Sequence, residues 1–91
     1  MDISKVEALT DLLLEAGHQH HQAFIEVDGD DPEWPIWYAE YLVDKLPAVL
    51  GKELTKSRIV YLLIHFSETL EASEGIHWTK QYAIAWLESQ N

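Results

Sequence analysis

Three histidines stand within four consecutive residues, at positions 18, 20 and 21, and imidazole is a common metal ligand. Successive residues of an α-helix are turned by about 100°, so these side chains would point in three different directions. Only His18 and His21 could share an ion, and zinc needs about four ligands. We therefore keep a metal site of His18, His21 and His65 as an alternative hypothesis. We predict that His20 points into the core, hydrogen-bonded to a tyrosine hydroxyl of the second or fourth helix.

Carboxylates are dense between residues 26 and 33, and hard cations such as calcium bind carboxylate oxygens. An EF-hand is excluded, because counting from Asp28 puts Pro32 at the fifth position, where a ligand is required. A solvated turn whose acids favour the start of the next helix explains the same residues. A weak cation site stays a second hypothesis, for Asp28, Asp30, Asp31 and Glu33.

Aromatic residues are concentrated just after this turn. Trp37 and Tyr41 are four residues apart and lie away from the apolar stripe of their own predicted helix, beside Trp34. Tryptophan and tyrosine are enriched in the parts of interfaces that contribute most to binding. We predict that Trp34, Trp37 and Tyr41 form a contact surface for a second copy or another protein. The alternatives are cover by the first helix or by the segment around Pro47, and a small-ligand pocket.

Helices must position all of these residues, because no segment alternates between apolar and polar residues as a strand does. The first predicted helix has a Ser-x-x-Glu capping box starting at Ser4 and a possible break at Gly17. Thr55 is the predicted N-terminal cap of the third helix. The sequence predicts an all-α, compact, antiparallel four-helix bundle. The four helices are expected at about 5–27, 32–46, 56–71 and 77–89.

The pattern Trp-x-x-x-Tyr-Ala occurs twice, beginning at Trp34 and again 44 residues later at Trp78. Two helical segments that share capping and periodicity could match by chance, but tryptophan and tyrosine are rare. We interpret the pattern as an internal duplication of a helical hairpin. The hairpins would span about 3–50 and 54–91 within a single domain, 1–91.

The segment 31–42 reads D-x-x-W-P-x-W-Y-A-x-x-L. It resembles a pattern of small bacterial helical proteins to which no activity is attached. The resemblance covers the first half of the chain well and the second half loosely, since Thr79 stands where the second copy would have proline. It implies a helical fold and nothing about chemistry.

Composition excludes several functions. Sixteen acidic and six basic residues give a net charge of −10, which disfavours nucleic acid as a partner. Without cysteine there is no disulfide, thiolate metal ligand or thiol nucleophile. The longest apolar run, 59–64, is too short to cross a membrane, and the start lacks the regions of a signal peptide, so we expect a cytoplasmic protein.

No catalytic arrangement stands out in the sequence. Serines and threonines fall in caps or on polar faces, and the four glycines are scattered rather than forming a phosphate-binding loop. We therefore favour a non-enzymatic helical interaction module that acts through its aromatic surface, with no cofactor. The alternatives are a metal-binding protein and a binder of a small ligand between the two hairpins.

Overall fold

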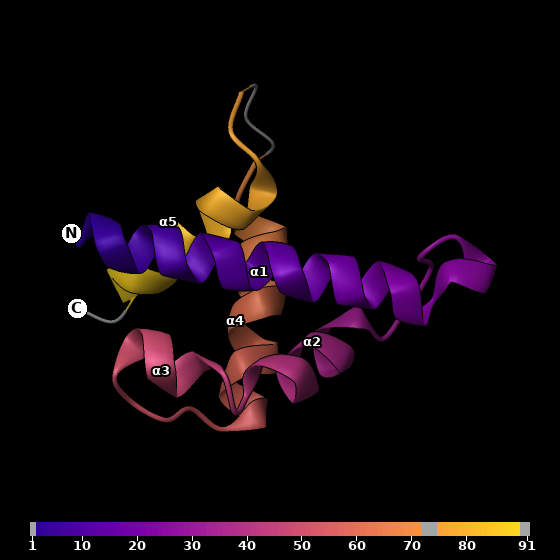
Figure 1. Ribbon diagram of the computed structural model, residues 1–91, viewed down its shortest axis with the longest axis horizontal. Helices are drawn as coiled ribbons and strands as arrows, with labels where there is room; N and C mark the ends of the chain where they lie inside the picture. The colour runs from indigo at the N-terminus through magenta and orange to yellow at the C-terminus, as the bar shows by residue number, and fades with distance from the viewer. Residues whose placement is uncertain (1, 72–74, 90–91) are drawn as a thin grey trace.

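The computed structural model describes residues 2–71 and 75–89 (Figure 1). Helices without any β-strand make up the regular structure of these residues, which confirms the all-α prediction. Among them no helix combines the length and the apolar character needed to cross a membrane. The helical elements are α1 (Ile3–Ala23), the 3-10 helix η1 (Ile25–Val27), α2 (Trp34–Leu42), α3 (Leu46–Leu50), α4 (Lys56–Thr69) and α5 (Trp78–Ser89).

Two helices end about one turn earlier than predicted. The first helix continues unbroken through Gly17 but ends at Ala23 rather than at 27, and a 3-10 turn follows. The second helix spans Trp34–Leu42 instead of 32–46, and Pro47, which has no N–H to donate, lies in the first turn of a separate helix, where it is tolerated. The chain therefore starts α3 at Leu46.

Capping explains where two of the helices begin. The predicted capping box at Ser4 is wrong: Asp2 caps α1, accepting a hydrogen bond of 2.9 Å from the Ser4 amide. Thr55 caps α4 as predicted, because its hydroxyl accepts from the Arg58 amide at 3.1 Å. Side-chain caps of this kind satisfy amides that have no partner within the helix.

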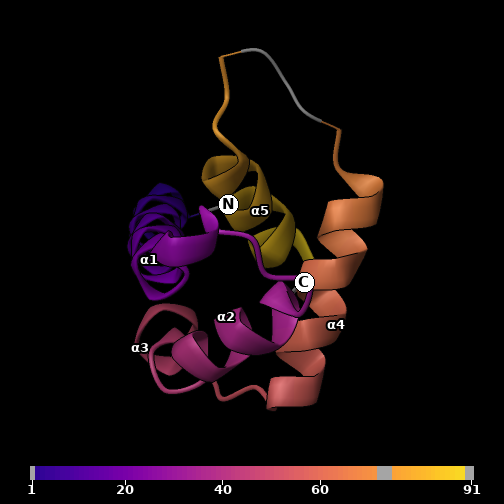
Figure 2. The same cartoon turned by 90° about the vertical axis from the view of Figure 1, so that its right-hand side faces the viewer.

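The helices do not form a simple antiparallel bundle. In Figure 1, α4 runs across α1 instead of beside it. α1 packs most extensively against α5, and α2 packs most extensively against α4. The first helix of each predicted hairpin thus pairs with the second helix of the other, which Figure 2 shows as α1 beside α5 and α2 beside α4.

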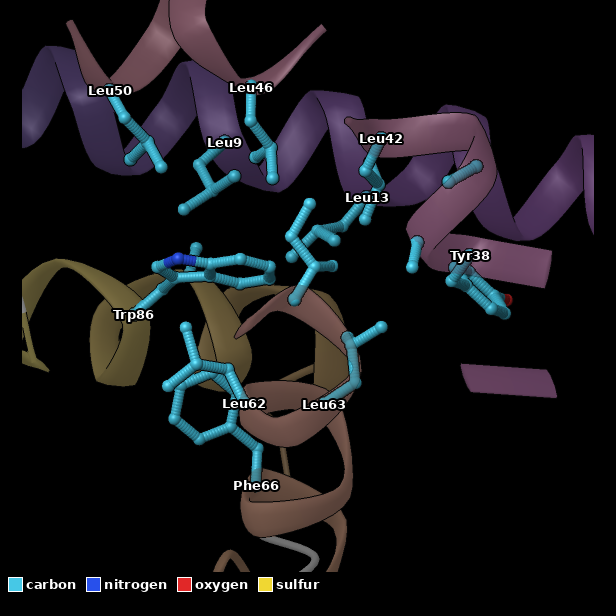
Figure 3. Close-up of a cluster of buried hydrophobic side chains, with 14 residues drawn as sticks. Leu9, Leu13, Tyr38, Leu42, Leu46, Leu50, Leu62, Leu63, Phe66 and Trp86 are labelled. Atoms are coloured by element: carbon cyan, nitrogen blue, oxygen red, sulfur yellow. The ribbon is translucent and has the colours of Figure 1, made fainter. Parts of the chain in front are cut away.

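The core lies where these pairs meet. Trp86 of α5 is fully buried and lies between leucines of α1 and α3 on one side and side chains of α4 on the other (Figure 3). Its indole ring lies 5.8 Å from the Phe66 ring, centroid to centroid. The other large side chains with almost no exposed surface are Leu9, Leu13, Leu42, Leu46, Ile59, Leu63 and Thr79.

Candidate functional site

The two Trp-x-x-x-Tyr segments, far apart in the sequence, meet at one cavity. Trp34 and Tyr38 of α2 line it together with Trp78 and Tyr82 of α5, and its volume is about 370 Å³. We call this cavity the aromatic pocket. Its remaining lining residues come from α1, the turn before α2, and α4: His20, Gly29, Asp30, Asp31 and Leu63.

The four rings form a chain of nearly perpendicular contacts. The Trp34 and Tyr38 rings are 5.9 Å apart at 84°, and the Tyr38 and Trp78 rings are 6.3 Å apart at 86°. The Trp78 and Tyr82 rings continue the series at 5.2 Å and 78°. Edge-to-face packing of this kind is a favourable geometry for aromatic side chains, so the rings hold one another as walls of the pocket.

Gly17 allows α1 to lie close to two of these walls. A Cβ atom placed on Gly17 would lie 3.5 Å from Cζ2 of Trp78 and 3.6 Å from the hydroxyl oxygen of Tyr38. These are ordinary van der Waals distances, so one methyl group fits and a longer side chain would displace a wall. The glycine therefore limits the size of the residue that this position can carry.

Gly17→Ala is expected to raise the free energy of unfolding by about 1 kcal/mol, because alanine is favoured over glycine inside a helix by that amount. Thermal unfolding followed by circular dichroism measures the change. Gly51→Ala is the control: Gly51 has a φ of +78°, where a side chain costs about 1–2 kcal/mol, so the same substitution should destabilise the domain there. A loss of stability in Gly17→Ala would contradict the packing described above.

A histidine–aspartate pair forms the polar part of the pocket. Nε2 of His20 lies 3.0 Å from Oδ2 of Asp31, and the two side chains are only 11% and 9% exposed. The burial of His20 confirms that it points inward, but the predicted tyrosine partner is wrong. The Tyr38 ring instead stacks on the imidazole, with the centroids 5.1 Å apart.

The turn between η1 and α2 brings Asp31 to His20. Asp28 and Gly29 both have positive φ, 58° and 81°, and so reverse the chain beyond α1. Oδ1 of Asp31 accepts a hydrogen bond of 3.0 Å from the Glu33 amide, which holds the start of α2. One carboxylate thus joins the turn, the imidazole and the first residues of α2.

The predicted contact surface is divided between two places. Trp34 lines the aromatic pocket, whereas Trp37 and Tyr41 stack on each other outside it, with centroids 5.4 Å apart at 10°. The Lys45 ammonium lies 4.0 Å from the centroid of the Tyr41 ring. All three aromatic residues are partly buried. Burial, and after it a hydrogen bond to Glu15 and the charge of that carboxylate, raises the pKa of Tyr41, which places α1 beside this stack.

The structure does not bring the predicted metal ligands together. His18 and His21 line a neighbouring cavity of about 430 Å³, which also includes His77. His65 lies on α4 and stacks on Tyr61 at 5.8 Å. Within residues 2–71 and 75–89, no three His, Asp or Glu side chains are arranged to hold a metal ion. A site made from His18, His21 and His65 is therefore not assembled in this fold.

The four carboxylates of the predicted cation turn also separate. Asp30 and Asp31 line the aromatic pocket, and Asp28 lines the neighbouring cavity. Glu33 is exposed and lines neither. The turn therefore directs two carboxylates to the aromatic pocket instead of gathering four around one ion.

Two residues of the second half, Trp78 and Tyr82, were not predicted as site residues, nor was the pairing of His20 with Asp31. The repeated Trp-x-x-x-Tyr pattern could have suggested the first two, since equivalent residues of a duplicated unit occupy equivalent places. Nothing in the spacing of positions 20 and 31 indicates their contact, because it depends on the conformation of the turn between them.

The phenols of the pocket are difficult to ionise. Burial raises the pKa of Tyr38 above its ordinary value of 10.0, and the negative charge that Tyr82 carries when ionised raises it further. Burial also raises the pKa of Tyr82. Both phenols therefore stay neutral at physiological pH and serve as walls and hydrogen-bonding groups, not as anions.

Stability should fall as the pH rises past about 10. Because the pKa of each phenol is higher in the folded state, the unfolded chain releases these protons first. The stabilisation that each protonated phenol gives the folded state is fully present below the pKa of the phenol in the unfolded chain. It is lost as the pH rises through the higher pKa of the folded state. Urea unfolding between about pH 8 and pH 11 measures the decline. Tyr82→Phe should make it shallower and bring the pKa of Tyr38 closer to 10.0; an unchanged decline would contradict the assignment.

Comparison with known protein families, with curated proteins and with solved structures found no match. The resemblance of residues 31–42 to small bacterial helical proteins stays a prediction.

Proposed function

We propose that this domain is a binding module that takes a small ligand in the aromatic pocket. The observation that carries the proposal is the convergence of Trp34 and Tyr38 with Trp78 and Tyr82 on one cavity beside a buried His–Asp pair. Segments 44 residues apart place the same residue types at the same cavity, which also supports an internal duplication.

The size and chemistry of the pocket fit this role. Its volume of about 370 Å³ lies at the lower end of the range of small-molecule sites, roughly 300–1,000 Å³. Such sites have mainly apolar and aromatic walls and a few polar groups that orient the ligand. The pocket has both, and one of its aromatic walls, Trp78, is 37% exposed to solvent.

A fragment screen by NMR tests the proposal. Binding fragments are expected to shift the indole N–H resonances of Trp34 and Trp78 in the wild type, and Trp78→Ala should abolish binding by removing one wall. Tyr41→Ala is the matched control, because Tyr41 does not line the pocket and its ring packs on Trp37 instead. A screen in which no fragment perturbs these indoles, or in which Trp78→Ala binds as the wild type does, would overturn the proposal.

A second candidate function is docking to a protein, or self-association, through the stack of Trp37 and Tyr41. It is supported by the partial exposure of this stack and by the neighbouring Ile36, which is 50% exposed. Light scattering over a concentration series measures self-association, which Trp37→Ala and Tyr41→Ala should weaken. A monomer at every concentration, unaffected by either change, would count against self-association. The pair Trp78→Ala and Tyr41→Ala thus separates the two functions.

Two further properties belong to the proposal. The net charge of −10 supports partners other than nucleic acid, because phosphate backbones are repelled. The absence of cysteine is compatible with the cytoplasm as the place of action.

A further inference from the structure

We infer that the ligand of the aromatic pocket is an organic cation with an alkylated ammonium group. The inference rests on the proposed function and names the chemical class of its ligand. Two features carry it together: the aromatic walls and the carboxylates that accompany them. Neither feature alone would distinguish a cation from a neutral apolar molecule.

The walls are suited to an alkylammonium ion. A cation within about 6 Å of an aromatic centroid is attracted by the negative face of the ring, and tryptophan is the strongest partner. In the pocket, successive rings are 5.2–6.3 Å apart and turned by 78–86°, so differently oriented rings border one small space. Recognition of alkylated ammonium groups uses several aromatic rings around one ion, and here four rings line one cavity.

The charges of the pocket favour the same ligand. Asp31 and Asp30 line it, and its described lining contains neither lysine nor arginine. The Asp31 side chain is only 9% exposed, so water screens its charge weakly. The contact with His20 occupies one site on the carboxylate, which can accept about four hydrogen bonds. Asp31 therefore keeps free acceptor capacity toward the pocket after its contacts with His20 and the Glu33 amide.

Other ligand classes fit less well. An inorganic cation needs several oxygen or imidazole ligands around it, and no such group occurs in the described part of the chain. An anionic ligand would be repelled by Asp31 and by the net charge of −10. A neutral apolar ligand would cover the Asp31 carboxylate without compensating its charge.

Choline and 3,3-dimethylbutan-1-ol provide a matched pair of probes, because they share a shape and differ in charge. NMR titration of the wild type is expected to show choline binding about tenfold more tightly or better, with shifts at the Trp34 and Trp78 indoles. Equal binding of the two would overturn the inference while leaving a ligand-binding pocket. A screen in which fragments bind but choline does not would overturn it in the same way, whereas failure of every fragment would also overturn the proposed function.

Asp31→Asn tests the role of the carboxylate. The amide oxygen can still accept from the Glu33 amide, so the turn is kept while the charge is lost. The preference for choline should fall about tenfold, and binding of the neutral analogue should stay unchanged. Asp28→Asn is the control, since it removes one charge from the same turn, outside the pocket lining, and asparagine tolerates positive φ. Equal losses in both variants would contradict a specific role for Asp31.

The cation could be free in solution or carried on a side chain of another protein. Titration with acetyl-trimethyllysine methylamide, beside choline, separates these sources. Tighter binding of the lysine derivative would assign the pocket to an alkylated lysine, and tighter binding of choline would assign it to a free ammonium compound. Binding of neither overturns the inference.

Discussion

Replacing Trp86 with alanine is expected to lower the free energy of unfolding by about 3–5 kcal/mol, as for other buried large aromatic residues. Trp86 is fully buried and contacts the centre of the core, so truncation leaves a cavity between helices that cannot all move in to fill it. Single domains are stable by only about 5–15 kcal/mol, so the variant should unfold at a much lower urea concentration. Far-UV circular dichroism follows the transition without depending on tryptophan fluorescence.

Trp86→Phe separates the volume of the side chain from its polar atom. The buried Nε1 atom of Trp86 has no hydrogen-bond partner among the residues that the structure describes. An unsatisfied buried donor costs about 1–3 kcal/mol, so phenylalanine, which lacks it, should offset part of the lost packing. We expect Trp86→Phe to be at least about 2 kcal/mol more stable than Trp86→Ala. A cost below about 1 kcal/mol for Trp86→Ala would show that Trp86 is not central to the core.

Separating His20 from Asp31 is expected to have the second largest effect. Removing one partner of a buried hydrogen bond leaves the other partner unsatisfied, which costs about 1–3 kcal/mol and more for a charged group. His20→Phe keeps an aromatic ring against Tyr38 and Phe24 and removes the hydrogen bond to Asp31. Asp31→Ala removes the partner of the imidazole. Each single variant should lose about 1–3 kcal/mol of unfolding free energy, measured by urea denaturation.

The double variant His20→Phe/Asp31→Ala supplies the control. Asp31→Ala also removes the hydrogen bond from the Glu33 amide, but this loss occurs in both variants that carry the substitution and cancels in the cycle. The coupling energy should be about 1–3 kcal/mol. Additive losses would mean that His20 and Asp31 stabilise the domain independently.

The helices themselves could be predicted from the sequence, but their partners could not. Apolar periodicity and the Thr55 cap located α4 and α5 to within about two residues, because both signals are local to each helix. The same periodicity shows which face of a helix is apolar without showing which helix covers it. For this reason the pairing of α1 with α5 and of α2 with α4 was missed.

The candidate site shows a similar limit. The repeated pattern marked Trp34 and Trp78 as equivalent, but a helical projection gives only directions around one helix axis. The projection of the second helix grouped Trp34 with Trp37 and Tyr41, whereas in the fold Trp34 lines the same pocket as aromatic residues of α5. Asp31 was interpreted as one of several acids in a turn, because its contact with His20 requires the left-handed conformation of Asp28, which the sequence does not reveal.

The exchange of packing partners between the two halves has a consequence for synthesis on the ribosome. α1 has its main partner in α5, the last helix of the domain to be translated, and α5 also carries Trp86. When residues up to Gly51 have emerged, α1 and α2 can coil, but their apolar faces still lack the helices that cover them. The core therefore cannot be completed until nearly all of the domain is available, and until then the apolar faces of α1 and α2 are open to aggregation.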